Sequence, residues 1–467
     1  MKSPASIVLL LIWMSAGVLA ERPNVIILFT DDHGTLDANC LGASDLLTPN
    51  IDRLADSGIR FTQAYAHQVC CPSRAALLTG RHPQRTGVDD WAQGNRRASE
   101  AVVANSKAAN ANLKTEEITI AEALKSAGYE TALFGKWHLG ARVGHGPLDQ
   151  GFDQFFGHLG GFIDNYRHYF LHGKGFHDLY DNNEEIFRPG EYFPDMMMER
   201  AIEFLEADHH QPFFLMVAFN LPHYPEQPTG KFADAYADMA MPRQSYARVV
   251  STVDDYIGRV LDKLDEKAIR KNTIIVLMGD NGHSAEDNKG VLFDDHKSGF
   301  PLGHYYSANG GGGFTGKWIG HKGQYLEGGI RVPAILSHPA SIPGGQVRDQ
   351  VVTVMDWFPT ILEIATIPKP NVKFDGHSLL PIIHDADAKS SHQELHFGWP
   401  SGWAVRKDEW KLIAKLNRNK PEMIHLSLHN LADQRPELAD YAKRRPDIVR
   451  RLTKLHNTWA ADVSGAP

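Results

Sequence analysis

The first residues with the types and spacing for chemistry lie between Cys70 and Gly80, in the segment CCPSRAALLTG. Ser73 can cap a helix that the following alanines and leucines continue and that Gly80 ends. Cys70 is therefore expected near the amino terminus of a short helix. Unpaired N–H groups and the positive end of the helix dipole gather there, and Arg74 adds a positive charge. The segment predicts a pocket for a small tetrahedral anion.

A second set of polar side chains follows two apolar runs that read as buried strands. Asp31 and Asp32 come after the first run, and Asp280 and Asn281 come after the second. Ligands of open α/β sheets bind at the carboxyl ends of the strands, so we expect these four side chains to meet. Oxygen ligands without thiolate or imidazole select a hard cation, and their number suits calcium better than magnesium. The sequence predicts one calcium site.

The elements that must position these residues alternate along the chain. Continuous apolar runs are typical of strands buried on both faces of a parallel sheet, and three of the four runs each follow an expected helix. The pattern predicts an α/β fold with a large, mostly parallel or mixed sheet sandwiched by helices. The helices are expected at 48–58, 118–127, 195–206 and 246–264, and the strands at 24–30, 131–134, 213–219 and 273–278.

The composition changes after residues 368–370, where short alternating strands and a charged terminal helix follow. We therefore predict a catalytic α/β domain over 21–375 and a small C-terminal α+β subdomain over 376–467. The stretch 281–322 is rich in Gly and His and has no periodicity, which is typical of a mobile surface loop. Its position after Asn281 would let it border a substrate. A polar stretch at 96–114 also reads as a surface loop.

Residues 1–20 have the basic start, apolar centre and small-residue end of a secretory signal peptide. We expect cleavage near Ala20 and export to the periplasm or the medium, without a membrane anchor, because the apolar run is shorter than a spanning helix. A net charge of −8 gives no basic patch for nucleic acid. Three cysteines are too few for a disulfide framework, although Cys40 and Cys71 could pair.

The segment from Cys70 to Gly80 matches C-x-P-S-R-x-x-L-x-T-G at every fixed position. This pattern resembles the signature of the type I sulfatases, arylsulfatase-like enzymes of the alkaline phosphatase superfamily. The resemblance implies an alkaline phosphatase-like fold. It also implies that a formylglycine-generating enzyme converts Cys70 to formylglycine, whose hydrated aldehyde is the nucleophile. Spacing excludes Cys71, which directly precedes Pro72.

The resemblance extends to the metal site and the basic residues. It implies that Asp31, Asp32, Asp280, Asn281 and the modified Cys70 hold one calcium ion. The segments GKWHLG, LPH and HKGQYLEGGIRVP also look like family motifs, and they contain Lys136, His138, His223 and Lys322.

The family mechanism gives each basic residue a role. Calcium and Arg74 would hold the sulfate, and Lys136 and Lys322 would neutralise the sulfuryl oxygens. His223, with Lys322, would protonate the leaving alkoxide. His138 would assist the release of sulfate, and Asp280 could accept the proton of the attacking hydroxyl.

The implied function is that of a sulfuric ester hydrolase acting on a sulfated carbohydrate or an aryl sulfate, of the secreted bacterial polysaccharide-sulfatase type. One alternative is a phosphatase or phosphodiesterase of the same superfamily, although these typically use Ser or Thr and two metals. Another is a non-catalytic carbohydrate-binding relative, which would be expected to have lost a ligand or the nucleophile. The aromatic stretch 152–180 could stack on sugar rings or form a core patch.

Overall fold

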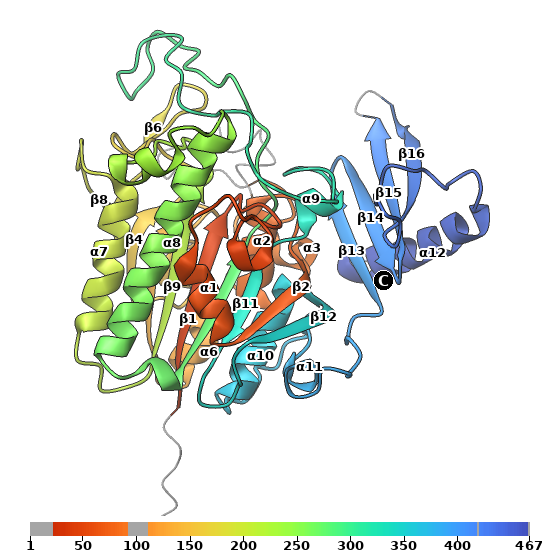
Figure 1. Ribbon diagram of the computed structural model, residues 1–467, viewed down its shortest axis with the longest axis horizontal. Coiled ribbons are helices and arrows are strands. Elements are labelled where there is room, and N and C mark those ends of the chain that lie inside the picture. The colour runs from red at the N-terminus through yellow and green to blue at the C-terminus, as the bar shows by residue number, and fades with distance from the viewer. Residues whose placement is uncertain (1–21, 92–110, 418–419, 466–467) are drawn as a thin grey trace, which may run out of the picture.

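The computed structural model describes residues 22–91, 111–417 and 420–465, and it is built around one ten-stranded mixed sheet (Figure 1). The predictions for the signal peptide and for residues 96–110 fall outside the described residues. In spatial order the strands are β12 (Gln346–Thr353), β2 (Ile59–Tyr65), β11 (Ala334–Ser337), β10 (Thr273–Gly279), β1 (Asn24–Asp31), β9 (Phe213–Pro222), β3 (Glu130–Lys136), β4 (Gln154–His158), β7 (Tyr180–Asp181) and β8 (Glu184–Glu185).

The centre of the sheet is parallel, as predicted. Strands β10, β1, β9, β3 and β4 run in one direction, and Val25 of β1 pairs with Ile274 on one side and Phe214 on the other. Strand β11 runs against its two neighbours, which makes the sheet mixed. All residues of β9 and β10 are buried, because helices cover both faces.

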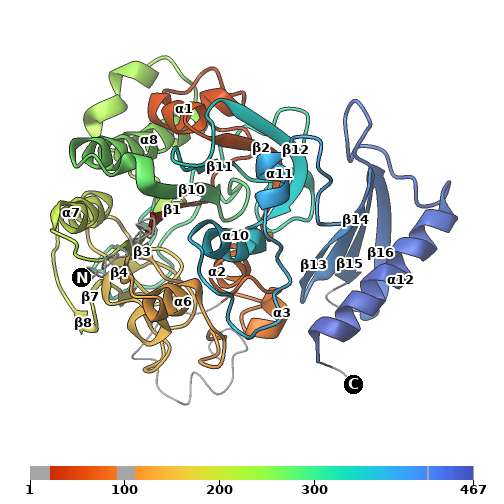
Figure 2. The ribbon, with the colours of Figure 1, turned by 90° about the horizontal axis from the view of Figure 1, so that it is seen from below.

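Alternate residues of β1 face two separate cores. Ile26 and Leu28 pack with the first core, under α1 (Pro49–Asp56), α7 (Phe193–Glu206) and α8 (Arg243–Glu266). Val25, Ile27 and Phe29 pack with the second, under α2 (Cys70–Thr79), α6 (Ile120–Ser126) and α10 (Trp357–Ile364). Figure 2 shows these two sets of helices on opposite sides of the sheet. The predicted sandwich of helix, sheet and helix is confirmed.

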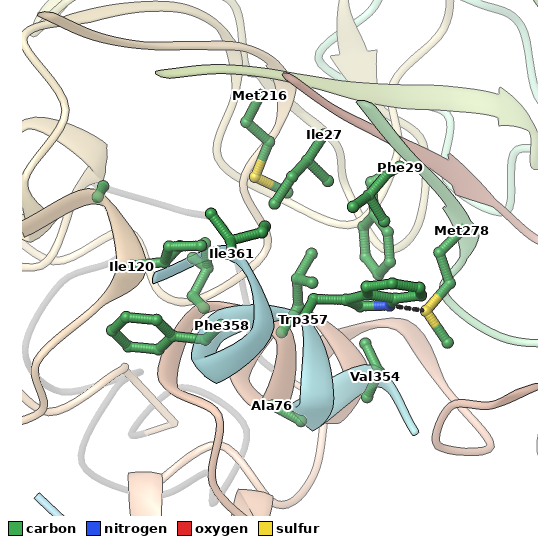
Figure 3. Packing of buried hydrophobic residues seen from close by; sticks show 14 of the residues in the cluster. Ile27, Phe29, Ala76, Ile120, Met216, Met278, Val354, Trp357, Phe358 and Ile361 are labelled. Atoms are coloured by element: carbon green, nitrogen blue, oxygen red, sulfur yellow. Dashed lines mark hydrogen bonds between the residues drawn. The ribbon is translucent and has the colours of Figure 1, made fainter. Parts of the chain in front are cut away.

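Trp357 joins helix α10 to the sheet at the centre of the second core (Figure 3). Its indole Nε1 donates to Sδ of Met278 in β10 at 2.7 Å, and its ring meets Phe61 of β2 edge to face. Ala76 of α2 belongs to the same cluster. This packing fixes α2, which carries the anion-pocket motif, against the sheet.

The chain between β10 and the short helix α9 (Glu327–Ile330) forms one long excursion. Apart from two isolated bridges, between Asp287 and Asn309 and between Gly290 and Tyr305, it contains no strand or helix, as predicted. In Figure 1 it rises from the end of the sheet at which β1 finishes. It therefore lies where it can border a site at the carboxyl ends of the strands.

The C-terminal part forms a four-stranded antiparallel sheet, which fits the predicted α+β subdomain. Its strands are β13 (Glu394–Trp399), β14 (Gly402–Lys407), β15 (Trp410–Asn417) and β16 (Lys420–Asn430). Leu395, Phe397 and Ile413 pack against Tyr65 of the large sheet. The opposite face packs on α12 (Pro446–Val463). The boundary at residue 375 stays a prediction.

The remaining elements are short. They are the helices α3 (Pro83–Thr86) and α11 (Leu380–His384) and a two-stranded sheet of β5 (Tyr169–Phe170) and β6 (Phe176–His177). Within the described ranges, no helix combines the length and apolarity needed to cross a bilayer. Cys40, Cys70 and Cys71, all in the described part, form no disulfide with one another.

The predicted cap of helix α2 is wrong in detail. The helix begins at Cys70 and not after Ser73, with Val69 as the extended N-cap residue. The Ser73 hydroxyl accepts from the backbone N–H of His67 at 2.9 Å, so it fixes the preceding loop. Gly80 ends the helix in the left-handed conformation at φ 65°, as predicted. Cys70 is therefore the first residue of the helix.

Candidate active site

The carboxyl ends of four neighbouring strands supply the predicted polar residues. Asp280 follows β10, Asp31 ends β1, His223 follows β9 and Lys136 ends β3. Because these strands are parallel and adjacent, their ends meet at one edge of the sheet. The sequence order of the four residues says nothing of this adjacency.

Cys70 reaches this edge from the amino terminus of α2. Its Sγ lies 3.4 Å from Oδ1 of Asp31, and both side chains are buried. Burial and the charge of Asp280 raise the pKa of the Cys70 thiol well above its usual value. An unmodified Cys70 is therefore a neutral thiol and a poor nucleophile.

Asp32 occupies the left-handed region at φ 59°, which turns the chain sharply after β1. Its backbone N–H donates to Oδ1 of Asp280 at 3.1 Å, and its Oδ1 accepts from Nδ2 of Asn281 at 2.6 Å. Its Oδ2 accepts from Nζ of Lys322 at 3.0 Å. Asp32 thereby links the ends of β1 and β10 to the loop that carries Lys322.

Arg74 and Lys136 lie beneath the site and do not line its cavity. Arg74 donates from Nη2 to Oδ2 of Asp280 at 3.0 Å and from Nη1 to the carbonyl oxygen of Lys136 at 2.9 Å. Lys136 donates from Nζ to Oδ2 of Asp31 at 2.7 Å. Both cations are almost fully buried. They hold the carboxylates in place rather than facing the opening.

Three carboxylates and three cations share this small buried volume. Burial and neighbouring carboxylates raise the pKa of Asp32 to about 7 and that of Asp280 to about 6. Burial also opposes ionisation of Asp31, but Lys136, His223 and Arg74 hold its pKa well below the usual value. Crowded acids of this kind favour an additional positive charge.

The donor set fits a metal ion. Ligand atoms of Asp31, Asp32, Cys70 and His223 all lie within 4.8 Å of one another. Oδ1 of Asn281 is buried and has no hydrogen-bond partner among the described residues. An unpaired buried amide oxygen is costly unless something positive binds it. The carboxylates of Asp31 and Asp32 and this amide oxygen are oxygen ligands, which suit a hard cation such as calcium.

A cavity of about 510 Å³ opens above Cys70. Cys70, His138, His223 and Lys322 line it, together with Trp91, Phe162, His172, Tyr224, His321 and the loop residues 284–286. The structure thus gathers all six predicted catalytic residues and the predicted metal ligands at one edge. Four of the six catalytic candidates line the cavity, and Arg74 and Lys136 lie below it.

The two histidines predicted to be catalytic, His138 and His223, are held differently. Nδ1 of His223 donates to the carbonyl oxygen of Tyr224, and Nε2 lies 3.6 Å from Oδ2 of Asp32. Both ring nitrogens of His138 are buried without a partner among the described residues. Burial and nearby lysines hold the pKa of each ring well below its usual value. His138 also lies at a positive φ of 58°.

Comparison with known proteins agrees with this geometry. The family model described as Sulfatase matches residues 23–367, which is most of the chain.

The chain belongs to the sulfatase family. A second model, described as N-sulphoglucosamine sulphohydrolase, C-terminal, matches residues 317–440.

Individual relatives give the same result. Human steryl-sulfatase is 30% identical over 83% of this chain and 74% of its own length. Mouse N-acetylgalactosamine-6-sulfatase is 33% identical over 80% of this chain and 69% of its own. The crystal structure of Ps i-CgsB in complex with k-i-k-neocarrahexaose covers 95% of this chain and 93% of its own, with a TM-score of 0.76 and 27% identity. The chain is therefore a type I sulfatase of the alkaline phosphatase superfamily, a sulfuric ester hydrolase.

The aromatic stretch 152–180 contributes Phe162 and His172 to the wall of this sulfatase's cavity, whereas Tyr224 was not predicted to line it. Phe162 stacks on the ring of His223 with centroids 5.5 Å apart, and Tyr224 lies 5.0 Å from Phe162. Both belong to buried aromatic packing, so residues near 162 serve as core and wall together. Glu286 was also missed, because nothing in an aperiodic loop marks which acid turns inward. The position of Tyr224 directly after the predicted catalytic residue His223 was the one feature of the sequence that could have placed Tyr224 in the cavity wall.

Proposed function

We propose that this sulfatase removes sulfate from a sulfated carbohydrate, using Cys70 converted to formylglycine together with one calcium ion. The observation that carries the proposal is the position of Cys70. Its side chain lies at the cavity floor, 3.4 Å from Asp31, with Lys322 and His223 in the same wall. A nucleophile there would face an anion whose charge those two residues can stabilise.

The chemistry of the thiol supports conversion of Cys70. An unmodified thiol with a raised pKa is a weak nucleophile. The burial of Cys70 beside carboxylates disfavours the thiolate that cysteine catalysis would need. The hydrated aldehyde of formylglycine would supply two hydroxyls, one to attack sulfur and one to expel sulfate afterwards. This role requires a formylglycine-generating enzyme as a partner during maturation.

Calcium would be held by Asp31, Asp32, Asp280 and Asn281, with the modified Cys70 as a further ligand. The unpaired Oδ1 of Asn281 and the raised pKa values of Asp32 and Asp280 support this donor set. When bound, the ion would supply positive charge for a sulfate oxygen and for the attacking hydroxyl. Arg74 and Lys136 would keep two of the carboxylates ionised and aligned.

The residues in the cavity wall would manage charge and protons. Lys322 holds Asp32 and faces the cavity, so it can neutralise a sulfuryl oxygen. As the S–O bond to the sugar breaks, the leaving alkoxide needs a proton, which His223 with Lys322 would give. His138 has two unpaired ring nitrogens and would serve the later release of sulfate.

The aromatic wall supports a sugar substrate. Phe162 and Tyr224 line the cavity beside the predicted proton donor, where a pyranose ring could pack against aromatic side chains. The oligosaccharide complex of Ps i-CgsB and the name of N-acetylgalactosamine-6-sulfatase concern sulfated sugars in similar proteins. Export after cleavage near Ala20 would bring the enzyme to such polysaccharides.

Two measurements test the proposal. Protein produced with a formylglycine-generating enzyme is digested with trypsin. The mass of the peptide ending at Arg74 is then measured by mass spectrometry to detect the conversion of Cys70. The same protein is then assayed for sulfate release from sulfated oligosaccharides and from an aryl sulfate. Higher kcat/KM for a sugar ester is expected. Turnover of the aryl sulfate alone would contradict the choice of carbohydrate.

A further inference from the structure

The substrate cavity contains one carboxylate with no part in the predicted metal or sulfate chemistry. Glu286 lies in the loop after β10, and its side chain is 38% exposed. Among the described residues that line the cavity, Glu286 is the one carboxylic acid and Lys322 is the one lysine or arginine. The described lining of the cavity therefore combines one acid with one lysine and contains no second lysine or arginine.

Glu286 contacts Tyr224, the residue that follows the predicted proton donor His223. Tyr224 lies close enough to Glu286 to lower the pKa of its carboxyl group, and Tyr224 directly follows His223. Nζ of Lys289 lies 3.4 Å from Oε1 of Glu286, but Lys289 does not line the cavity. Although burial opposes its ionisation, Lys322, Tyr224 and Lys289 keep the pKa of Glu286 below its usual value. The group is ionised at neutral pH.

Arg74 and Lys136 do not line the cavity, and Lys322 is the lysine proposed to serve the sulfate that is removed. Arg74 pairs with Asp280, Lys136 pairs with Asp31, and Lys322 pairs with Asp32. A second sulfate on the same sugar would enter the cavity without a further lysine or arginine among the described lining residues to pair with it. The carboxylate of Glu286 lines the same cavity, and two like charges in a partly buried cavity repel.

A carboxylate in this position suits a different neighbour. Ionised Glu286 accepts hydrogen bonds and can take two from adjacent sugar hydroxyls. We propose that Glu286 is a specificity-determining residue, which accepts hydrogen bonds from free hydroxyls of the sulfated sugar and excludes a second anionic group from it. The preferred substrates are then sugars with a single sulfate and no carboxylate on the recognised ring. This inference rests on the proposed carbohydrate function.

The test compares pairs of substrates on the formylglycine-containing, calcium-loaded enzyme. Hexose and hexosamine monosulfates are each paired with the disulfate of the same sugar, and kcat/KM is measured for both. Wild-type enzyme should favour the monosulfate. Glu286→Gln keeps the shape and removes the charge, so the ratio of disulfate to monosulfate kcat/KM should rise about tenfold.

Asp287→Asn is the matched control. Asp287 is the next residue of the same loop, is exposed, and does not line the cavity. Its substitution removes the same charge and should leave the ratio within about twofold. An equal shift in both variants, or no shift in Glu286→Gln, overturns the role of Glu286. Wild-type enzyme that hydrolyses an aryl sulfate but none of the sugar sulfates overturns the carbohydrate function itself, and the inference with it.

Discussion

Sγ of Cys70 lies 3.4 Å from Oδ1 of Asp31, so the first residue of helix α2 meets the last residue of strand β1. These residues are 39 positions apart in the chain. Their contact brings the helix amino terminus, with its unpaired N–H groups, to the edge where the carboxylates gather.

The first prediction concerns which cysteine is modified. We expect Cys70 to be found as formylglycine, with Cys40 and Cys71 unchanged, in peptides of active enzyme. Cys70→Ala should lower kcat by ~10³-fold or more, because the nucleophile is lost. Cys70→Ser, which lacks the second hydroxyl, should accumulate as a stable sulfate ester seen by intact mass.

Cys71→Ser is the control for that experiment. Cys71 does not line the cavity, so its variant should keep substantial turnover. A fully active enzyme with an unmodified Cys70 would falsify the formylglycine mechanism.

The second prediction concerns the metal. Chelator-treated enzyme should lose activity and regain it with calcium, and calcium at 100 times its Kd should add about 2.7 kcal/mol to the free energy of unfolding. Asn281→Ala removes the unpaired Oδ1 and should weaken calcium binding in a titration followed by calorimetry. Asn288→Ala, at an exposed loop position, should bind calcium like wild type. Full activity in verified metal-free protein would rule the site out.

The third prediction concerns the space beside His138. A Cβ at Gly161 would lie 2.8 Å from Cε1 and 3.0 Å from Nε2 of His138, so Gly161→Ala must displace the ring. We expect kcat to fall about tenfold or more, because misplacement by about 1 Å is costly in catalysis. The melting temperature should change little, since the ring borders a cavity.

Gly230→Ala provides the comparison, because a Cβ at Gly230 meets no atom within 4 Å. It should keep wild-type kcat. Equal kcat values in the two alanine variants would show that the position of His138 is unimportant.

The fourth prediction concerns the junction with the C-terminal sheet. Glu327 of α9 is fully buried and accepts from Nζ of Lys411 in β15 at 2.8 Å and from Tyr65 at 2.6 Å. Although burial opposes its ionisation, Lys411 and Arg331 lower the pKa of Glu327 from 4.5 to about 2. Glu327→Gln should therefore lower the free energy of unfolding at pH 7 by about 3 kcal/mol.

The pH dependence of that loss follows from the sign of the shift. A carboxyl whose folded pKa is depressed stabilises the fold above its unfolded pKa, and this contribution is lost as pH falls towards the folded value. The difference between wild type and Glu327→Gln in urea unfolding should shrink from pH 4.5 towards pH 2. Glu363→Gln, which breaks a half-exposed pair with Lys369, should have little effect at any pH.

The local sequence pattern determined the central strands, the helix that carries Cys70 and the edge of the sheet at which the site lies. The apolar runs predict β1, β9 and β10 because strands buried on both faces need continuous hydrophobic residues. The segment from Cys70 to Gly80 predicts a helix with Cys70 near its start. Asp31 and Asp280 could be expected to meet, because parallel strands bring their carboxyl ends to one edge.

Tertiary structure alone decided the rest, because it depends on contacts between distant residues. The sequence could not show that Ser73 fixes the loop before α2, because a serine hydroxyl at this position could equally cap the helix. It could not show that Arg74 and Lys136 lie below the cavity while Lys322 lines it, because all three carry the same charge. Glu286 turns inward through its contact with Tyr224, and that contact exists only once the loop after β10 folds over the end of β9.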